Sequence, residues 1–137
     1  MSLNAARVAR EFPSRYRLDA SKCSKCGAIV FPPREVCPAC RGMKFAPLRL
    51  CPEGRVVTWT VIHVGPSSHR HEVPYPLAIV ELDDGPRVTC QVVDVDPATV
   101  TTGMRVRLEF RRIQEDGEAG IIAYGHKAVV AQTEPRG

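Results

Sequence analysis

The sequence lacks the features that mark membrane, secreted and nucleotide-processing proteins. No apolar run approaches the ~18 residues of a membrane span, and residues 1–20 are too polar and too rich in arginine to form a signal peptide. No glycine-rich phosphate loop of the Rossmann or P-loop type is present. We therefore expect a cytoplasmic protein with no membrane partner, and not an enzyme that holds a nucleotide in such a loop.

A recognisable catalytic motif is also absent. The chain contains possible bases and nucleophiles, but none lies in a motif that joins a nucleophile, a base and an orienting group. These candidates are His63, His69, His71, His126, Cys51 and Cys90. We therefore expect a chain that is not itself an enzyme.

Aromatic residues are few, at 6% of the 137-residue chain. No expected strand carries two or three of them as a platform for stacking bases, which argues against a single-stranded nucleic-acid-binding protein. The net charge of +4 is modest, so it suits an anionic partner such as a nucleotide or nucleic acid without requiring one. Nucleic-acid binding is therefore the alternative function and not the favoured one.

What the sequence does contain is a doubled cysteine motif. Two residues separate Cys23 from Cys26, two separate Cys37 from Cys40, and ten lie between the pairs. This spacing lets paired thiolates turn toward one point, and four sulfurs complete the tetrahedral shell that structural zinc prefers. Two disulfides or a redox dithiol are the alternatives, but nothing indicates secretion or a thioredoxin pattern. We expect one structural Zn²⁺ with no open coordination position.

The order of the expected elements predicts a mainly β protein. A helix over 4–17, interrupted at Pro13, is too short to be stable alone and must dock on its own domain or on a partner. A rubredoxin-like zinc ribbon follows, and then five strands with a helical turn, N-capped by Asp96, between the third and the fourth. The expected strands span 55–64, 77–82, 87–95, 105–113 and 121–130, with a charged loop at 114–120. This order is that of an OB-fold barrel.

These patterns divide the chain into three parts. An N-terminal helical segment occupies 1–20, the zinc ribbon 21–50 and the five-stranded OB-fold domain 51–137.

Several short segments resemble one protein family. Besides the cysteine pairs they are Tyr16-Arg-Leu, Phe31-Pro-Pro-Arg34, Ile79-Val-Glu-Leu-Asp-Asp-Gly85, Gly103-Met, Phe110-Arg-Arg-Ile and Gly120-Ile-Ile-Ala-Tyr-Gly125. Over nearly its whole length the chain is similar to the thiolase-associated zinc-ribbon/OB-fold proteins, and most to the archaeal type that sits between acetoacetyl-CoA thiolase and HMG-CoA synthase. The resemblance implies a non-catalytic bridging subunit that binds CoA or acyl-CoA and aids assembly and intermediate channelling.

Basic and aromatic residues on the last two strands form a candidate site for that ligand. Guanidinium groups suit the 3′-phosphate and diphosphate of CoA, and aromatic rings suit its adenine. The residues expected to bind CoA are Arg111, Arg112, Tyr124, His126 and Lys127. The alternative is a solvated strand face whose charges pair locally with Glu109 and Glu115.

Overall fold

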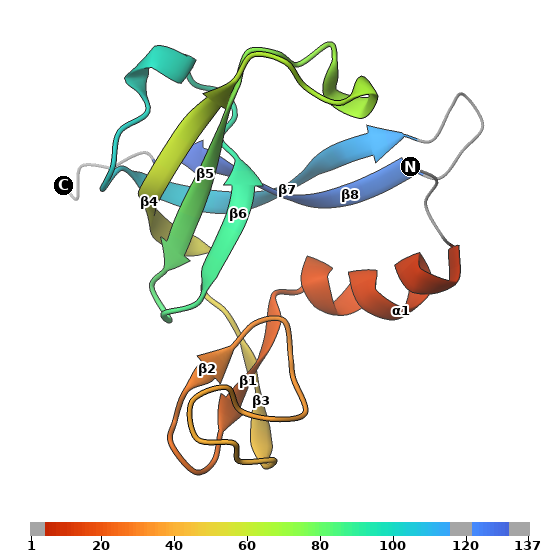
Figure 1. Cartoon of the computed structure of the whole chain (residues 1–137), viewed down its shortest axis with the longest axis vertical. Helices are drawn as coiled ribbons and strands as arrows, with labels where there is room; N and C mark the ends of the chain where they lie inside the picture. The colour runs from red at the N-terminus through yellow and green to blue at the C-terminus, as the bar shows by residue number, and fades with distance from the viewer. Residues whose placement is uncertain (1–4, 116–121, 132–137) are drawn as a thin grey trace, which may run out of the picture.

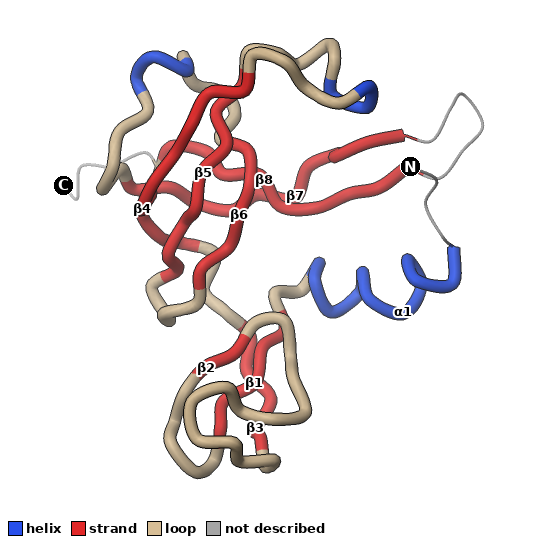
Figure 2. The backbone as a smooth tube through the Cα atoms, viewed as in Figure 1, coloured by secondary structure: helices blue, strands red, loops and turns tan. Residues whose placement is uncertain are grey.

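The computed structural model describes residues 5–115 and 122–131, and it shows one α-helix and two antiparallel sheets (Figures 1 and 2). This confirms the mainly β architecture expected from the sequence. Most of the loop expected at 114–120 lies outside the described residues. No helix in the described ranges is long and apolar enough to cross a lipid bilayer.

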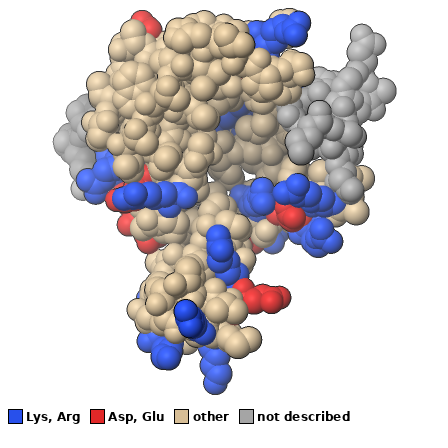
Figure 3. Space-filling model, in the orientation of Figure 1, with Lys and Arg blue, Asp and Glu red and all other residues tan. Residues whose placement is uncertain are grey.

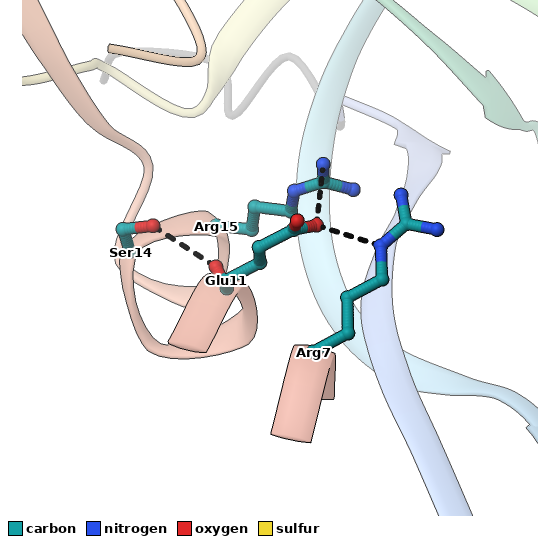
Figure 4. A network of polar contacts seen from close by, with 4 residues as sticks. All are labelled: Arg7, Glu11, Ser14 and Arg15. Carbon is teal, nitrogen blue, oxygen red and sulfur yellow. Dashed lines mark hydrogen bonds and ion pairs between the residues drawn. The ribbon is translucent and has the colours of Figure 1, made fainter. Parts of the chain in front are cut away.

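The N-terminal helix, α1 (Ala5–Tyr16), is a single helix although it contains Pro13. Proline cannot donate a backbone hydrogen bond, so the turn around it depends on side chains. Ser14 Oγ donates to the Glu11 carbonyl oxygen at 2.9 Å, and the Glu11 carboxylate accepts from Arg7 and Arg15 at 3.1 and 3.2 Å (Figure 4). Arg7 lowers the pKa of Glu11 through this hydrogen bond. These exposed pairs contribute little stability, so packing must hold α1 in place.

Three short strands form the ribbon, in the order β2-β1-β3. They are β1 (Asp19–Cys23), β2 (Ile29–Val30) and β3 (Phe45–Arg49). The sequence predicts the ribbon but not its central strand, because Asp-Ala-Ser-Lys has a low intrinsic β propensity. Pairing on both sides overrides that propensity: Ser21 lies opposite Val30 on β2 and Pro47 on β3.

The second sheet is a nearly closed five-stranded barrel in the order β6-β5-β4-β7-β8, which confirms the expected OB-fold. Its strands are β4 (Glu53–Ile62), β5 (Tyr75–Leu82), β6 (Arg87–Gln91), β7 (Arg105–Glu115) and β8 (Ile122–Val130). An isolated parallel bridge joins Val92, just after β6, to Ala128 of β8 and brings the two edges of the barrel together. The expected helical turn is a 3-10 helix at Pro97–Thr99, capped by the Asp96 carboxylate, which accepts from the Ala98 amide at 2.9 Å.

The barrel and the base of the ribbon share one hydrophobic core. Val56, Val80 and Val106 fill the barrel and are fully buried. Leu18 and Leu50, from the two chain segments that join the ribbon to its neighbours, belong to the same buried cluster, and the Leu50 amide donates to the Leu18 carbonyl oxygen at 3.0 Å. The ribbon therefore sits on the barrel through packed side chains and not through a loose linker.

The hairpin of β7 and β8 extends beyond the rest of the barrel (Figure 1). β4 pairs with β7 only at Glu53–Arg55, so the outer half of the hairpin has no strand partner on that side. The sequence groups Val106, Leu108 and Phe110 on one apolar face, and the structure buries the first two but leaves Phe110 51% exposed. The inner face of the hairpin is thus buried within the barrel and exposed toward the outer end of the hairpin. The helix α1 lies against this outer end.

Candidate metal centre and ligand cleft

Two backbone turns present the four cysteines of the ribbon. In the first, the Cys23 amide donates to Ala28 and Gly27 donates back to Cys23, at 2.8 and 2.9 Å. Gly27 has a φ of +76°, which favours glycine. In the second turn Cys37 corresponds to Cys23 and Gly42 to Ala28, since the Cys37 amide donates to the Gly42 carbonyl oxygen at 2.8 Å.

The four sulfurs have the spacing of a tetrahedral metal site. All lie within 4.8 Å of one another, and the Cys23–Cys40 and Cys26–Cys37 Sγ pairs are each 3.6 Å apart. Zinc–sulfur bonds of ~2.3 Å require a tetrahedron edge of about 3.8 Å. The Gly42 amide also points at Cys40 Sγ, at 3.4 Å, as an N–H donor to a metal-bound thiolate would.

Without a cation, the four neighbouring cysteines do not all ionise together. Backbone amides of Cys26 and Lys25 lower the pKa of Cys23 to about 6. The amide of Ala28 favours the Cys26 thiolate, but the Cys40 thiol and burial outweigh it and raise the pKa of Cys26 to about 12. Four thiolates this close repel one another, so a cation is needed to keep all of them deprotonated. The residues therefore fit structural zinc, whose shell they would fill completely.

The structure separates the five residues expected to bind CoA. Arg112 pairs with Tyr124, and Phe110 pairs with His126, so these side chains share the inner face of the hairpin. Arg111 and Lys127 point to the opposite, outer face of the hairpin. The sequence grouped all five as one site, although consecutive residues of a strand, such as Arg111 and Arg112 or His126 and Lys127, point to opposite faces.

The two residues on the outer face already have acidic partners. Arg111 donates to Asp94 at 2.8 Å and to Glu109 at 3.0 Å, the second of which is the local pairing weighed above. Lys127 is only 6% exposed, and its Nζ lies 3.3 and 3.4 Å from the two carboxylate oxygens of Glu72. These interactions assign Arg111 and Lys127 structural contacts on the far side from Tyr124.

Glu72 is a residue that the sequence did not single out. It belongs to the loop between β4 and β5, and its carboxylate also accepts from Gln91 Nε2 at 2.7 Å. Burial opposes its charge, but the bond from Gln91 and the nearby Lys127 outweigh burial and lower the pKa of Glu72. Glu72 therefore fastens this loop to β6 and β8. Nothing in the sequence pairs it with Lys127, 55 positions away.

Replacing Glu72 by glutamine is expected to destabilise the protein by about 1 kcal/mol near neutral pH, because a charge-assisted pair with a buried ammonium is lost from a partly exposed site. The folded-state pKa of Glu72 is lowered, so this stabilisation is complete above its ordinary pKa and disappears as the pH falls through the folded value. Urea unfolding of both proteins between pH 3 and pH 7 measures the difference.

The matched control is Glu81→Gln, which removes an exposed pair with Arg87. Its effect should stay within a few tenths of a kcal/mol. If the difference in unfolding free energy between Glu72→Gln and the unaltered protein does not shrink toward low pH, the charged contacts of Glu72 are not its cause.

The inner face of the hairpin carries a cluster of aromatic rings. Phe110 stacks on Tyr124 with ring centroids 5.5 Å apart and meets His126 edge-on at 6.0 Å. From α1, Tyr16 contacts Phe110 edge-on at 4.9 Å, and Phe12 lies 5.5 Å from Tyr16. The sequence argument considered one strand at a time, and it did not foresee a cluster whose rings come from two strands and a helix.

A cleft of about 550 Å³ opens beside this cluster, where α1, the ribbon and the barrel meet. Figure 3 shows the surface hollowed between the barrel and the helix. Tyr124 and His126 line the cleft, and Phe31 contributes from the ribbon. The volume lies within the range of small-molecule sites.

The cysteines outside the metal set are poorly placed for nucleophilic chemistry. Burial raises the pKa of Cys90 to about 11, which suppresses its reactive thiolate. Burial lowers the pKa of His126, so this ring is neutral at pH 7. Within the described residues, no hydrogen bond joins a histidine to Cys51 or Cys90.

Comparison with known proteins identifies both units. Residues 10–46 match the ChsH2 rubredoxin-like zinc ribbon domain, and residues 49–111 match the ChsH2 C-terminal OB-fold domain. A DUF35 domain-containing scaffold protein of Methanocaldococcus jannaschii is 44% identical over 119 residues, covering 86% of this chain and 84% of the relative. A probable enoyl-CoA hydratase alpha subunit of Thermomonospora curvata is 30% identical over 100 residues, covering 73% of this chain and 31% of the relative.

Among solved structures, the Ltp2-ChsH2(DUF35) aldolase matches with a TM-score of 0.66 and 26% identity, covering 92% of this chain and 98% of that one. These matches confirm the zinc-ribbon/OB-fold family that the cysteine pairs and strand motifs predicted. The chain therefore belongs to the family of DUF35 domain-containing scaffold proteins.

Proposed function

We propose that the protein is a non-catalytic scaffold subunit that bridges two enzymes, a thiolase-like acyltransferase and an HMG-CoA synthase. It holds CoA or acyl-CoA where the two enzymes meet. The observation that carries the proposal is the open aromatic cleft at the meeting point of helix, ribbon and barrel. The names of relatives support it: one is a scaffold protein, one an aldolase with ChsH2, and one an enoyl-CoA hydratase subunit.

The distribution of charge supports docking on an acidic partner. Residues 1–50 contain ten Lys and Arg against three Asp and Glu, whereas residues 51–137 contain nine against twelve. Blue side chains accordingly spread over α1 and the ribbon in Figure 3. The ribbon also carries Met43, which is 74% exposed, and Val36, which is 48% exposed. A basic surface with protruding apolar side chains suits an acidic protein surface that has apolar sockets.

On the barrel we propose three CoA contacts: Tyr124 and His126, which line the cleft, and Arg112, which lies outside the lining but opposite Tyr124 on β7. A guanidinium can pair with a phosphate, while Tyr124, 41% exposed, offers a ring to the adenine. Arg111 and Lys127 support the hairpin through their carboxylate partners.

The experiment is co-purification of the tagged chain, followed by calorimetric titration of the recovered complex with CoA. A thiolase-like partner should co-purify, and Arg112→Ala should weaken CoA binding at least about 10-fold. Arg111→Ala is the matched control, because it removes the same kind of side chain from the opposite face, and it should leave the affinity unchanged. Recovery of no thiolase-like protein would contradict the scaffold role.

Nucleic-acid binding is the second candidate, and the aromatic cluster is the observation that favours it. Bases would stack on these rings while phosphates follow the basic half of the chain. Oligonucleotide binding would fall steeply with salt because counterions are released. Tight oligonucleotide binding with such a salt dependence, together with no affinity for CoA, would favour this candidate.

A further inference from the structure

The helix α1 is attached to the rest of the protein mainly through aromatic rings. None of its residues is buried. Its basic side chains are exposed, and one of them, Arg15, lines the cleft together with Phe12 and Tyr16. Tyr16 contacts Phe110 of the hairpin, and Phe12 packs against Tyr16. The helix thus forms one wall of the cleft without contributing a buried core residue.

The lining of the cleft has the composition of a site for an aromatic anion. It includes five aromatic rings if His126 is counted, and two arginines, Arg15 and Arg87. No aspartate or glutamate is among the lining residues. Arg15 and Arg87 pair with Glu11 and Glu81 outside the lining, at 3.2 and 2.9 Å, so a bound anion has to share these guanidinium groups with the carboxylates. The ring-rich interior and the two arginines favour a ligand that combines a flat ring with phosphate.

Three polar groups in the cleft are available for a ligand. Within the described residues, no hydrogen bond engages the hydroxyl of Tyr16, the hydroxyl of Tyr124 or the ring nitrogens of His126. A hydrocarbon chain filling the cleft would strip water from these groups and offer them no partner, at a free-energy cost. A purine offers both donors and acceptors at its edge, so it would satisfy them.

We propose that α1 is part of the ligand site, and that Tyr16 and Arg15 close the cleft around the adenine nucleotide end of the ligand. This inference rests on the proposed CoA function, but it names the part of CoA that is held and adds a helix to the site. The shared chemistry is a purine with phosphate groups, which either CoA or a free adenine nucleotide can supply.

The test is calorimetric titration of the full-length protein with CoA, 3′-phosphoadenosine 5′-phosphate, ADP and pantetheine. CoA and 3′-phosphoadenosine 5′-phosphate should bind, and pantetheine should not. Tyr16→Ala should weaken binding of both nucleotides about 5- to 100-fold, the range for losing one ring–base stack. Equal binding of ADP would identify a free adenine nucleotide as the source, whereas a requirement for the 3′-phosphate would identify CoA.

Two further variants separate a ligand contact from a change in helix packing. Tyr16→Phe keeps the ring and removes only the hydroxyl, so it should weaken binding by less than Tyr16→Ala. Tyr75→Phe is the matched control, because Tyr75 contacts His69 and lies outside the cleft. In the unaltered protein, bound nucleotide should slow hydrogen exchange of the α1 amides.

The possible results distinguish the role of α1 from the proposed function. Unchanged affinity in Tyr16→Ala would overturn the role of α1 and leave the CoA proposal standing. Pantetheine binding as tight as that of CoA, or no nucleotide binding at all, would overturn the purine assignment. Tyr16-dependent nucleotide binding without a co-purifying thiolase-like protein would support this inference and contradict the scaffold role.

Discussion

Replacing Cys37 by serine is expected to remove the metal and unfold the ribbon. Cys37 is fully buried, and it is one of only four ligands in a closed sulfur shell. The ribbon's strands are two to five residues long, so they cannot hold together through pairing alone. Structural zinc sites contribute about 10–16 kcal/mol of apparent binding free energy, and losing a ligand forfeits most of it.

The loss should extend to the barrel, because Leu18 and Leu50 at the base of the ribbon belong to the shared core. We therefore expect Cys37→Ser to contain less than one zinc per chain and to unfold at a clearly lower temperature than the unaltered protein. Elemental analysis measures the zinc content, and thermal unfolding measures the stability. A strong chelator should lower the unfolding temperature of the unaltered protein in the same way.

Cys51→Ser is the matched control for this prediction. Cys51 is a half-buried cysteine just beyond Leu50 that does not belong to the sulfur cluster. The Cys51→Ser protein should keep one zinc per chain and nearly all of its stability. Purified protein that contains no zinc, or a Cys37→Ser variant that retains it, would contradict the metal assignment.

Replacing Gly54 by alanine is expected to destabilise the barrel by about 1–3 kcal/mol or more. Gly54 lies between two strands, opposite Leu82 on β5 and Val106 on β7. A Cβ atom there would overlap the Glu81 carbonyl oxygen and approach Leu82 Cα to 3.0 Å. Both are backbone atoms of a paired strand, so neither can move aside without breaking the sheet. Overpacking of this kind usually costs 1–3 kcal/mol where side chains can adjust, and about that much or more is expected here.

Thermal unfolding should show a midpoint lowered by roughly 4–8 °C for each kcal/mol lost, as for other domains of this size. The zinc content should not change, because Gly54 is remote from the cysteines in the ribbon turns.

Gly103→Ala separates steric overlap from backbone strain. Gly103 has a φ of +86° with no atom within 4 Å of an added Cβ, so only strain is introduced, worth about 1–2 kcal/mol. If Gly54→Ala proved no more destabilising than Gly103→Ala, the close approach of β4 and β5 would not be the reason for the glycine.

The sequence by itself determined the features that depend on neighbours along the chain. Two residues between paired cysteines bring their sulfurs together whatever surrounds them, so the metal set could be read directly. The same holds for the turn at Pro97–Thr99, where Asp96 caps a backbone amide two residues away. Alternation within each strand likewise indicated the barrel, because period two requires only local geometry.

Only the tertiary structure decided which residues share a surface. Register and a bulge between Arg112 and Gln114 set the pairing of β7 with β8, and neither is encoded by a local pattern. The two strands extend beyond the barrel, so Phe110 is exposed although it shares a strand face with the buried Val106 and Leu108. Contacts between distant segments, such as Tyr16 with Phe110 and Glu72 with Lys127, arise from how the elements pack. Of the five residues that the sequence named for the ligand site, only Tyr124 and His126 line the cleft. The rest of the lining comes from α1, the ribbon and the barrel, and depended on long-range packing.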